Sequence, residues 1–216
     1  MNSKFLKEWD KVDKESILGK IGGKIHHQPP LRERLSNSSY RIQVIHSKLE
    51  RLNNKMEQKN SELFEKCTKA VAERDQDRAT MYANECAQVK KMAKIVLRSQ
   101  LALEQVGLRL DTVKEFGDVA SEMGPLANVV HSLKGHLTGV MPEVSYELGV
   151  IGDTLNGLVL ESGEASGSTW DVEASGQEAT RILQDANSVA EQRMKDRFPD
   201  IPVPTATTSE KTSEFP

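Results

Sequence analysis

The sequence predicts an all-α protein, in which a long antiparallel helical hairpin is followed by shorter amphipathic helices and a disordered tail that contains proline. Three observations support this fold class. Apolar residues recur every seven positions in the first half of the chain, and no Gly or Pro interrupts residues 31–106. In the second half, short helical patterns alternate with Gly and Pro. A narrow apolar seam of this kind is typical of helices that pack along one edge.

The composition also argues against a rounded globular core. Of the 216 residues, 37% are hydrophobic and 5% aromatic, whereas 28% are charged. No apolar run approaches the roughly 18 residues that span a bilayer, and the N-terminus has no apolar signal core. Two cysteines, Cys67 and Cys86, are too few for a disulfide framework and indicate reduced thiols. We therefore expect a cytosolic protein that is neither exported nor transmembrane.

Charge is divided unequally along the chain. The formal net charge is −3, but residues 1–100 contain 21 Lys and Arg against 13 Asp and Glu, whereas residues 101–216 contain 8 against 19. A basic half is attracted to anionic surfaces, and an acidic half of the same chain can mask it.

Residues 1–30 are predicted to form a basic amphipathic segment and a flexible linker. Phe5, Leu6 and Trp9 lie at near-helical spacing among lysines, so they are candidate membrane anchors that insert shallowly into a headgroup layer. The alternative is a hydrophobic strip that packs on the hairpin or on a partner. The linker contains three glycines and two prolines, which loosen the backbone and remove helix donors.

Residues 31–116 are predicted to form the hairpin. The polar break at residues 73–75 indicates a tight turn between two helices of about forty residues, which gives a hairpin of about 60 Å. The first seam consists of Leu35, Ile42, Leu49, Met56, Leu63 and Ala70, with Ile45 and Leu52 beside it. The second consists of Tyr82, Cys86, Val89, Ala93, Val96, Leu103 and Leu110.

The rest of the chain is predicted to consist of four segments. These are short helices of the core and acidic arm (117–161), a Gly/Ser-rich linker (162–171), an acidic amphipathic helix (172–197) and an extended tail (198–216). Breaks in the first of these segments are expected at Gly124-Pro125, Gly135, Gly139 and Pro142.

A row of cations lies beside the first seam. Arg34, Arg41, Lys48 and Lys55 recur every seven residues, about 10 Å apart, with Arg32 and Arg51 nearby. Each such charge near an anionic lipid surface contributes about 1 kcal/mol. We expect this basic face to contact a membrane or the acids of a neighbouring subunit. The alternative is a set of solvated charges that flank a coiled-coil seam.

The acidic arm has no Lys or Arg between Lys134 and Arg181, an interval that contains eight acids. One hypothesis is that the arm folds back on the basic hairpin, and that its opening frees the basic face as a two-state switch. The alternative is that the acids only solubilise a flexible tail.

An alternating strip of apolar residues and prolines follows the last helix: Phe198, Pro199, Ile201, Pro202, Val203 and Pro204. Such a strip favours a polyproline-like backbone, which loses little entropy when it docks in a groove between helices. The alternative is a plain tail punctuated by proline.

Residues suited to catalysis or metal binding are scarce. His26-His27 lies in a linker without a Cys or carboxylate at ligand spacing, and no phosphate-binding Gly loop is followed by Lys-Ser/Thr. We therefore expect no enzymatic activity, cofactor, metal or nucleic acid partner.

The order of these segments resembles the ESCRT-III family, and in particular its archaeal CdvB branch. The resemblance covers about residues 1–204 and depends on the hairpin and three local sequences: PEVSYELGVIGDTLNGL, EATRILQDANSVAEQRM and FPDIPVP. It implies a filament subunit that polymerises on membranes and drives their constriction or scission in archaeal cell division. The protein would then act from the cytoplasm at the inner face of the cell membrane, at the division site.

The resemblance also implies partners. An AAA ATPase with an MIT domain (CdvC-like) would bind the strip from Phe198 to Pro204, which resembles a proline-rich MIT-interacting motif. Further partners are the chain itself, paralogous subunits and an anionic membrane. The sequence up to Pro216 has no room for the C-terminal winged-helix domain of some CdvB proteins, so contact with a CdvA-like recruiter would use another surface. The alternative function is a coiled-coil adaptor or membrane-curvature scaffold that does not polymerise.

Overall fold

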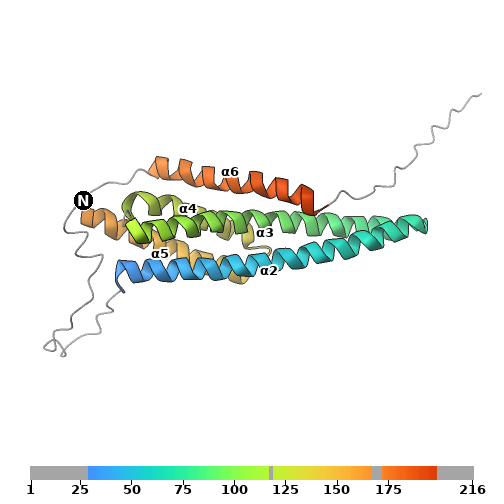
Figure 1. Cartoon of the computed structure of the whole chain (residues 1–216), viewed down its shortest axis with the longest axis horizontal. Coiled ribbons are helices and arrows are strands. Elements are labelled where there is room, and N and C mark those ends of the chain that lie inside the picture. Colours follow the sequence, from blue (N-terminus) through green and yellow to red (C-terminus); the bar gives the residue numbers. More distant parts are fainter. Residues whose placement is uncertain (1–28, 117–118, 167–171, 199–216) are drawn as a thin grey trace, which may run out of the picture.

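The computed structural model describes residues 29–116, 119–166 and 172–198, and every element in these ranges is a helix (Figure 1). The elements are α2 (Leu31–Ala72), α3 (Gln76–Phe116), α4 (Val119–Leu137), α5 (Pro142–Ser166) and α6 (Val172–Arg197). The predicted fold class, a long helical hairpin followed by shorter helices, is confirmed. The N-terminal segment up to residue 28 and the tail after Phe198 lie outside the described residues.

The hairpin turns at the predicted position, between Ala72 and Gln76. The backbone N–H groups of Glu73 and Asp75 donate to Lys69 and Ala70 and so satisfy the last carbonyls of α2. Arg74 adopts a left-handed conformation with φ of 59°, which costs a non-glycine residue about 1–2 kcal/mol. Asp75 then caps α3, because its carboxylate accepts a hydrogen bond from the N–H group of Arg78.

The two predicted seams face each other in the hairpin. All of the first seam is buried except Met56, and all of the second except Tyr82, each of which is partly buried. Two asparagines, Asn53 and Asn60, are also buried along α2, each with 2% of its surface exposed. The heptad pattern of apolar residues does not predict their burial, because asparagine is polar.

Three predicted boundaries are wrong. Gly124-Pro125 does not break the chain, because Pro125 lies inside α4, as does Gly135. An internal proline costs a helix about 3 kcal/mol. Burial of apolar residues around it offsets that cost, since Met123, Leu126 and Ala127 are fully buried. The linker expected at residues 162–171 also begins later, since α5 continues to Ser166 and buries Ser162 against the body.

Helices α4 and α5 form a second, shorter hairpin. Its connection follows Leu137, whose carbonyl accepts hydrogen bonds from Val140 and Met141, and Pro142 is the first residue of α5. Gly152 lies where the two helices approach closely. A Cβ atom at this position would lie 2.8 Å from the ring of His131.

The acidic half of the chain covers one part of the long hairpin. Helix α5 packs against α2, and α6 packs along α3 and α4, whereas the turn end of the hairpin extends beyond them (Figure 1). The main core joins all five helices around residues 31–49 and 96–113 of the hairpin. A separate, smaller cluster of Leu63, Cys86 and Val89 lies nearer the turn.

Candidate interaction surface

The six cations predicted as a basic face all lie on α2, and they differ in exposure. Arg32, Arg51 and Lys55 are exposed, whereas Arg34, Arg41 and Lys48 are half-buried. The seam residues Leu35, Ile42 and Leu49 face α3, which places the cations that directly precede them on the adjoining flank of α2. Part of the predicted row is thus covered in this structure.

Acids of α5 cover two of these cations. The guanidinium of Arg34 forms two contacts with the carboxylate of Glu161, at 2.9 and 3.0 Å. The ammonium of Lys48 lies 3.0 Å from the carboxylate of Glu147. The two cations are fourteen residues apart on α2, and the two acids are fourteen residues apart on α5, which is about 21 Å along each helix. The two antiparallel helices therefore bring both cations opposite both acids.

A second set of ion pairs joins α6 to the hairpin. Lys94 of α3 lies 2.9 Å from Glu191, and Arg109 pairs with Glu178. The hydrogen bond from Lys94, with another from Asn187, lowers the pKa of the Glu191 carboxyl. At the C-terminal end of α6 the helix supplies the cation instead of the acid, since Arg197 lies 3.5 Å from Glu57 of α2.

The cations of α3 were not among the predicted site residues. They do not repeat every seven positions, so a search for a heptad row passes over them. The signal that could have found them is a spacing match. Lys94 and Arg109 are fifteen residues apart, and their partners Glu191 and Glu178 are thirteen apart, which is close to four helical turns in both cases.

The ion pairs are individually weak. The side chain of Arg34 is only 13% exposed, but Lys94 and Glu191 are 46% and 50% exposed. Exposed pairs contribute about 0.2–1 kcal/mol each and are screened by salt. The electrostatic part of the contact between arm and hairpin is therefore easily reversed.

The two helices of the acidic arm, α5 and α6, differ in how much apolar surface they bury against the rest of the protein. Helix α5 buries an apolar face that includes Leu148, Ile151 and Leu155. Helix α6 buries one large side chain, Ile182, together with three alanines, Ala179, Ala186 and Ala190. Alanine buries little apolar area, so α6 is held less strongly than α5.

The predicted docking strip begins inside the fold. Phe198 is buried, with 4% of its surface exposed, and its N–H group donates to the carbonyl of Met194. The other predicted residues of the strip, Pro199, Ile201, Pro202, Val203 and Pro204, lie outside the described residues, as do the candidate anchors Phe5, Leu6 and Trp9.

The described residues provide neither a membrane-spanning helix nor a cluster of metal ligands. Among the described residues, no helix has the length and apolarity to cross a membrane. In the same part of the chain, no group of three or more His, Cys, Asp or Glu is arranged to hold a metal ion.

Comparison with known proteins identifies the family. The chain is 39% identical over 212 residues to cell division protein B1 of Sulfolobus acidocaldarius, covering 98% of this chain and 96% of the relative. It is 30% identical over 174 residues to cell division protein B of the same organism, covering 81% of this chain and 67% of that relative. No family model matches the chain, and no solved structure matches it.

The described order, a basic helical hairpin followed by shorter acidic helices, is the order on which the resemblance to ESCRT-III proteins depends. The relatives narrow this class to a single branch. The chain belongs to the CdvB family of archaeal cell division proteins.

Proposed function

We propose that this protein is a filament subunit that polymerises on membranes and drives their constriction or scission in archaeal cell division. The observation that carries the proposal is that acidic helices cover part of the basic hairpin. Glu147 and Glu161 neutralise Lys48 and Arg34, and α6 adds the pairs at Lys94 and Arg109. The names of the relatives support a role in cell division.

In this proposal the described structure is the closed subunit. Release of the arm frees two half-buried cations of α2 and joins them to the exposed ones, so that the hairpin presents one continuous basic face. An anionic membrane, or the acids of a neighbouring subunit, then replaces Glu147 and Glu161. A partner that binds the open form more tightly shifts the population toward it, by as much as its affinities for the two forms differ.

The ATPase is the second partner in this proposal. The strip from Phe198 to Pro204 binds the MIT domain of a CdvC-like AAA ATPase, which remodels the polymer. Since Phe198 is buried at the end of α6, full presentation of the strip requires that this end of α6 leave the hairpin. Weak packing of α6 through alanines makes it the first part of the arm to separate.

The remaining roles follow from assembly instead of catalysis. The subunit acts from the cytoplasm, peripherally on the inner face of the membrane, with copies of itself and paralogous subunits. A CdvA-like recruiter is proposed as a further partner.

The test compares two double variants with equal net charge. Glu147→Gln with Glu161→Gln removes both acidic partners on α5. Glu143→Gln with Asp185→Asn changes two exposed acids that form no ion pair with any described residue. Both are assayed by cosedimentation with anionic vesicles at low and high salt and by electron microscopy.

We expect the first double variant to bind vesicles and form filaments more readily than the wild type, and the control to behave as the wild type does. Discrete dimers that never lengthen on vesicles would support the alternative, a non-polymerising adaptor or curvature scaffold. Equal binding by all three proteins would contradict the proposed acidic cover.

The ATPase contact has its own measurement. Calorimetry with a peptide of residues 195–206 and an MIT domain should show binding that Ile201→Asp and Val203→Asp abolish. Affinity that survives both substitutions would contradict the assignment of the strip.

A further inference from the structure

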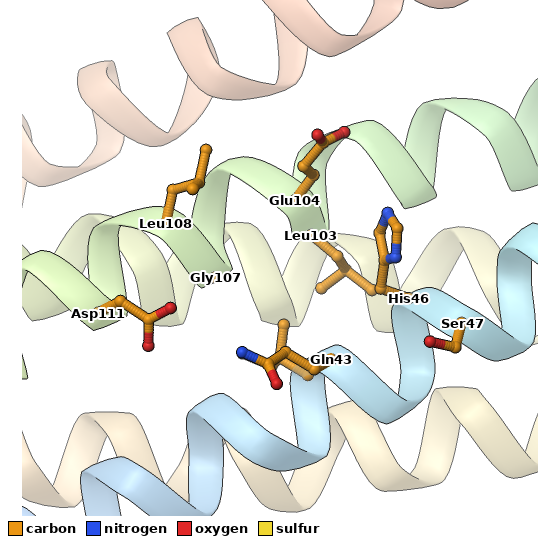
Figure 2. Close-up of a pocket in the computed structure, with 9 residues that line it drawn as sticks. Gln43, His46, Ser47, Leu103, Glu104, Gly107, Leu108 and Asp111 are labelled. Atoms are coloured by element: carbon orange, nitrogen blue, oxygen red, sulfur yellow. The ribbon is translucent and has the colours of Figure 1, made fainter.

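A groove lies between the two helices of the long hairpin, on the part that carries the main core. Figure 2 shows its lining, to which α2 and α3 both contribute. The cavity has a volume of about 320 Å³. Ile42 and Leu103 are buried in its lining, whereas Leu108 is 66% exposed.

Gly107 makes the groove possible. A Cβ atom at this position would meet only one atom within 4 Å, a methyl group of Ile42 at 3.9 Å, which is ordinary van der Waals contact. A larger residue would fit here without a clash at its Cβ atom and would raise the helix propensity by about 1 kcal/mol. The small side chain therefore leaves room beside α3 that the fold of the hairpin does not require.

The polar lining of the groove indicates the chemistry of an occupant. The Nε2 atom of His46 is buried and has no hydrogen-bond partner among the described residues, which costs about 1–3 kcal/mol. An N–H donor would satisfy this nitrogen when it is the acceptor of the neutral ring. Glu104 and Asp111 also line the groove and make it acidic. The matching ligand is an apolar side chain with an N–H group, on a segment whose net charge is positive.

The chain itself contains such a ligand outside the described residues. Trp9 has a large apolar ring with one N–H donor. Its direct neighbours are Glu8 and Asp10, and Lys7 and Lys11 lie two residues away on either side. Residues 1–28 contain six Lys against four Asp and Glu, so the segment complements the acidic lining. The segment joins the fold at Pro29-Pro30, directly before α2.

The connecting chain has a suitable length. From Leu31 to His46 the distance along α2 is about 22 Å at 1.5 Å per residue. The roughly twenty residues between Trp9 and Pro30 span about 25 Å on average as a flexible chain, at 5–6 Å times the square root of their number. A tether that matches its span gives a high effective concentration, about millimolar for short flexible linkers, so a single aromatic anchor can suffice.

We propose that the groove between α2 and α3 holds the N-terminal segment of the same chain, with the indole of Trp9 inserted beside Gly107 and His46. The bound segment is then withheld from a membrane or another subunit until the groove releases it. This inference rests on the groove and on the sequence of the segment. It does not require that the protein form filaments.

The test uses Trp9 as its own probe. The chain has two tryptophans, so Trp170→Phe leaves Trp9 as the only one. In this background we expect blue-shifted emission and protection from acrylamide, relative to a peptide of residues 1–28. Gly107→Leu fills the groove and should shift both signals to those of the peptide. Gly135→Leu is the matched control, because its Cβ atom meets nothing within 4 Å and lies outside the groove.

A second pair of variants guards against misfolding. Leu108→Ser and Leu160→Ser change side chains that are 66% and 64% exposed, so both proteins should keep their helical circular dichroism. Only Leu108 lines the groove, so only Leu108→Ser should expose Trp9.

Three outcomes would overturn the inference. The first is emission of the parent protein that equals that of the free peptide. The second is a blue shift that Gly107→Leu and Leu108→Ser leave unchanged. The third is a blue shift that disappears on dilution, because the groove would then hold the segment of a second copy.

Discussion

The two halves of the long hairpin differ in what holds them together. The covered half, residues 31–56 and 90–116, packs against α4, α5 and α6 and contains the hairpin's share of the main core. The distal half, residues 57–89, includes the turn and one small buried cluster. Met56 contacts both cores, and the ion pair between Arg197 and Glu57 lies at the same level. The arm thus ends where the main core ends.

The distal half also contains a buried asparagine at the seam, Asn60, as the covered half does at Asn53. The side-chain oxygen of Asn60 is buried without a hydrogen-bond partner among the described residues. A buried asparagine at a seam position lowers stability but specifies the register of two helices. Nearby, burial raises the pKa of the Cys86 thiol, which therefore stays protonated at neutral pH. The comparison indicates that the covered half supplies most of the stability, and that the distal half is a thin, register-defined extension.

The largest expected effect comes from truncation of the main core. Ile45→Ala removes a fully buried side chain and should lower the free energy of unfolding by about 3–5 kcal/mol. Leu63→Ala in the distal cluster should cost about 2 kcal/mol, because Leu63 has fewer buried neighbours. Chemical denaturation followed by circular dichroism measures both values. An equal loss for the two variants would contradict the division into halves.

A smaller effect of opposite sign is expected at Asn60. Asn60→Leu removes the unpaired buried oxygen and should stabilise the distal half by about 1 kcal/mol. Hydrogen exchange should slow in residues 57–89 and remain unchanged in the covered half. The exposed substitution Asn54→Leu is the matched control, since it changes the same residue type away from the seam. Faster exchange in the distal half of Asn60→Leu would show that the asparagine is needed for more than register.

The smallest effect concerns acid and His136 of α4, the helix that packs against the covered half. Burial, together with the nearby guanidinium of Arg98, lowers the pKa of His136 below its ordinary value of 6.5. Between 6.5 and the lowered pKa of the folded state, the unfolded chain binds a proton that the folded chain does not. The stability that is present above pH 6.5 is therefore lost as the pH falls through this range. His136→Gln should reduce the fall in melting temperature between pH 7.5 and 5.5. An identical fall in both proteins would show that His136 is not the source of the acid sensitivity between pH 7.5 and 5.5.

Much of the fold was predictable because the signals are local. The hairpin seams, the turn at residues 73–75 and the apolar face of α5 each follow from periodicity or capping within a few turns of chain. The failures have the opposite cause. Pro125 stays within α4, and α5 reaches Ser166, because burial against other helices outweighs the local preference of proline, glycine and serine.

The candidate site shows the same division. A heptad search finds Arg34 and Lys48 but cannot say that their partners are Glu161 and Glu147, since that depends on the face and direction in which α5 meets α2. The burial of Phe198 likewise does not follow from the sequence, because apolar residues that alternate with prolines predict an extended strip.

The sequence by itself determined that this protein is a helical hairpin with a basic half and an acidic half, because residue spacing and charge are properties of the chain alone. Only the tertiary structure decided which cations are covered, where the cover ends and where a groove remains between α2 and α3. These features depend on how helices far apart in the sequence pack together, and small residues such as Gly107 and the alanines of α6 influence that packing without a periodic signal.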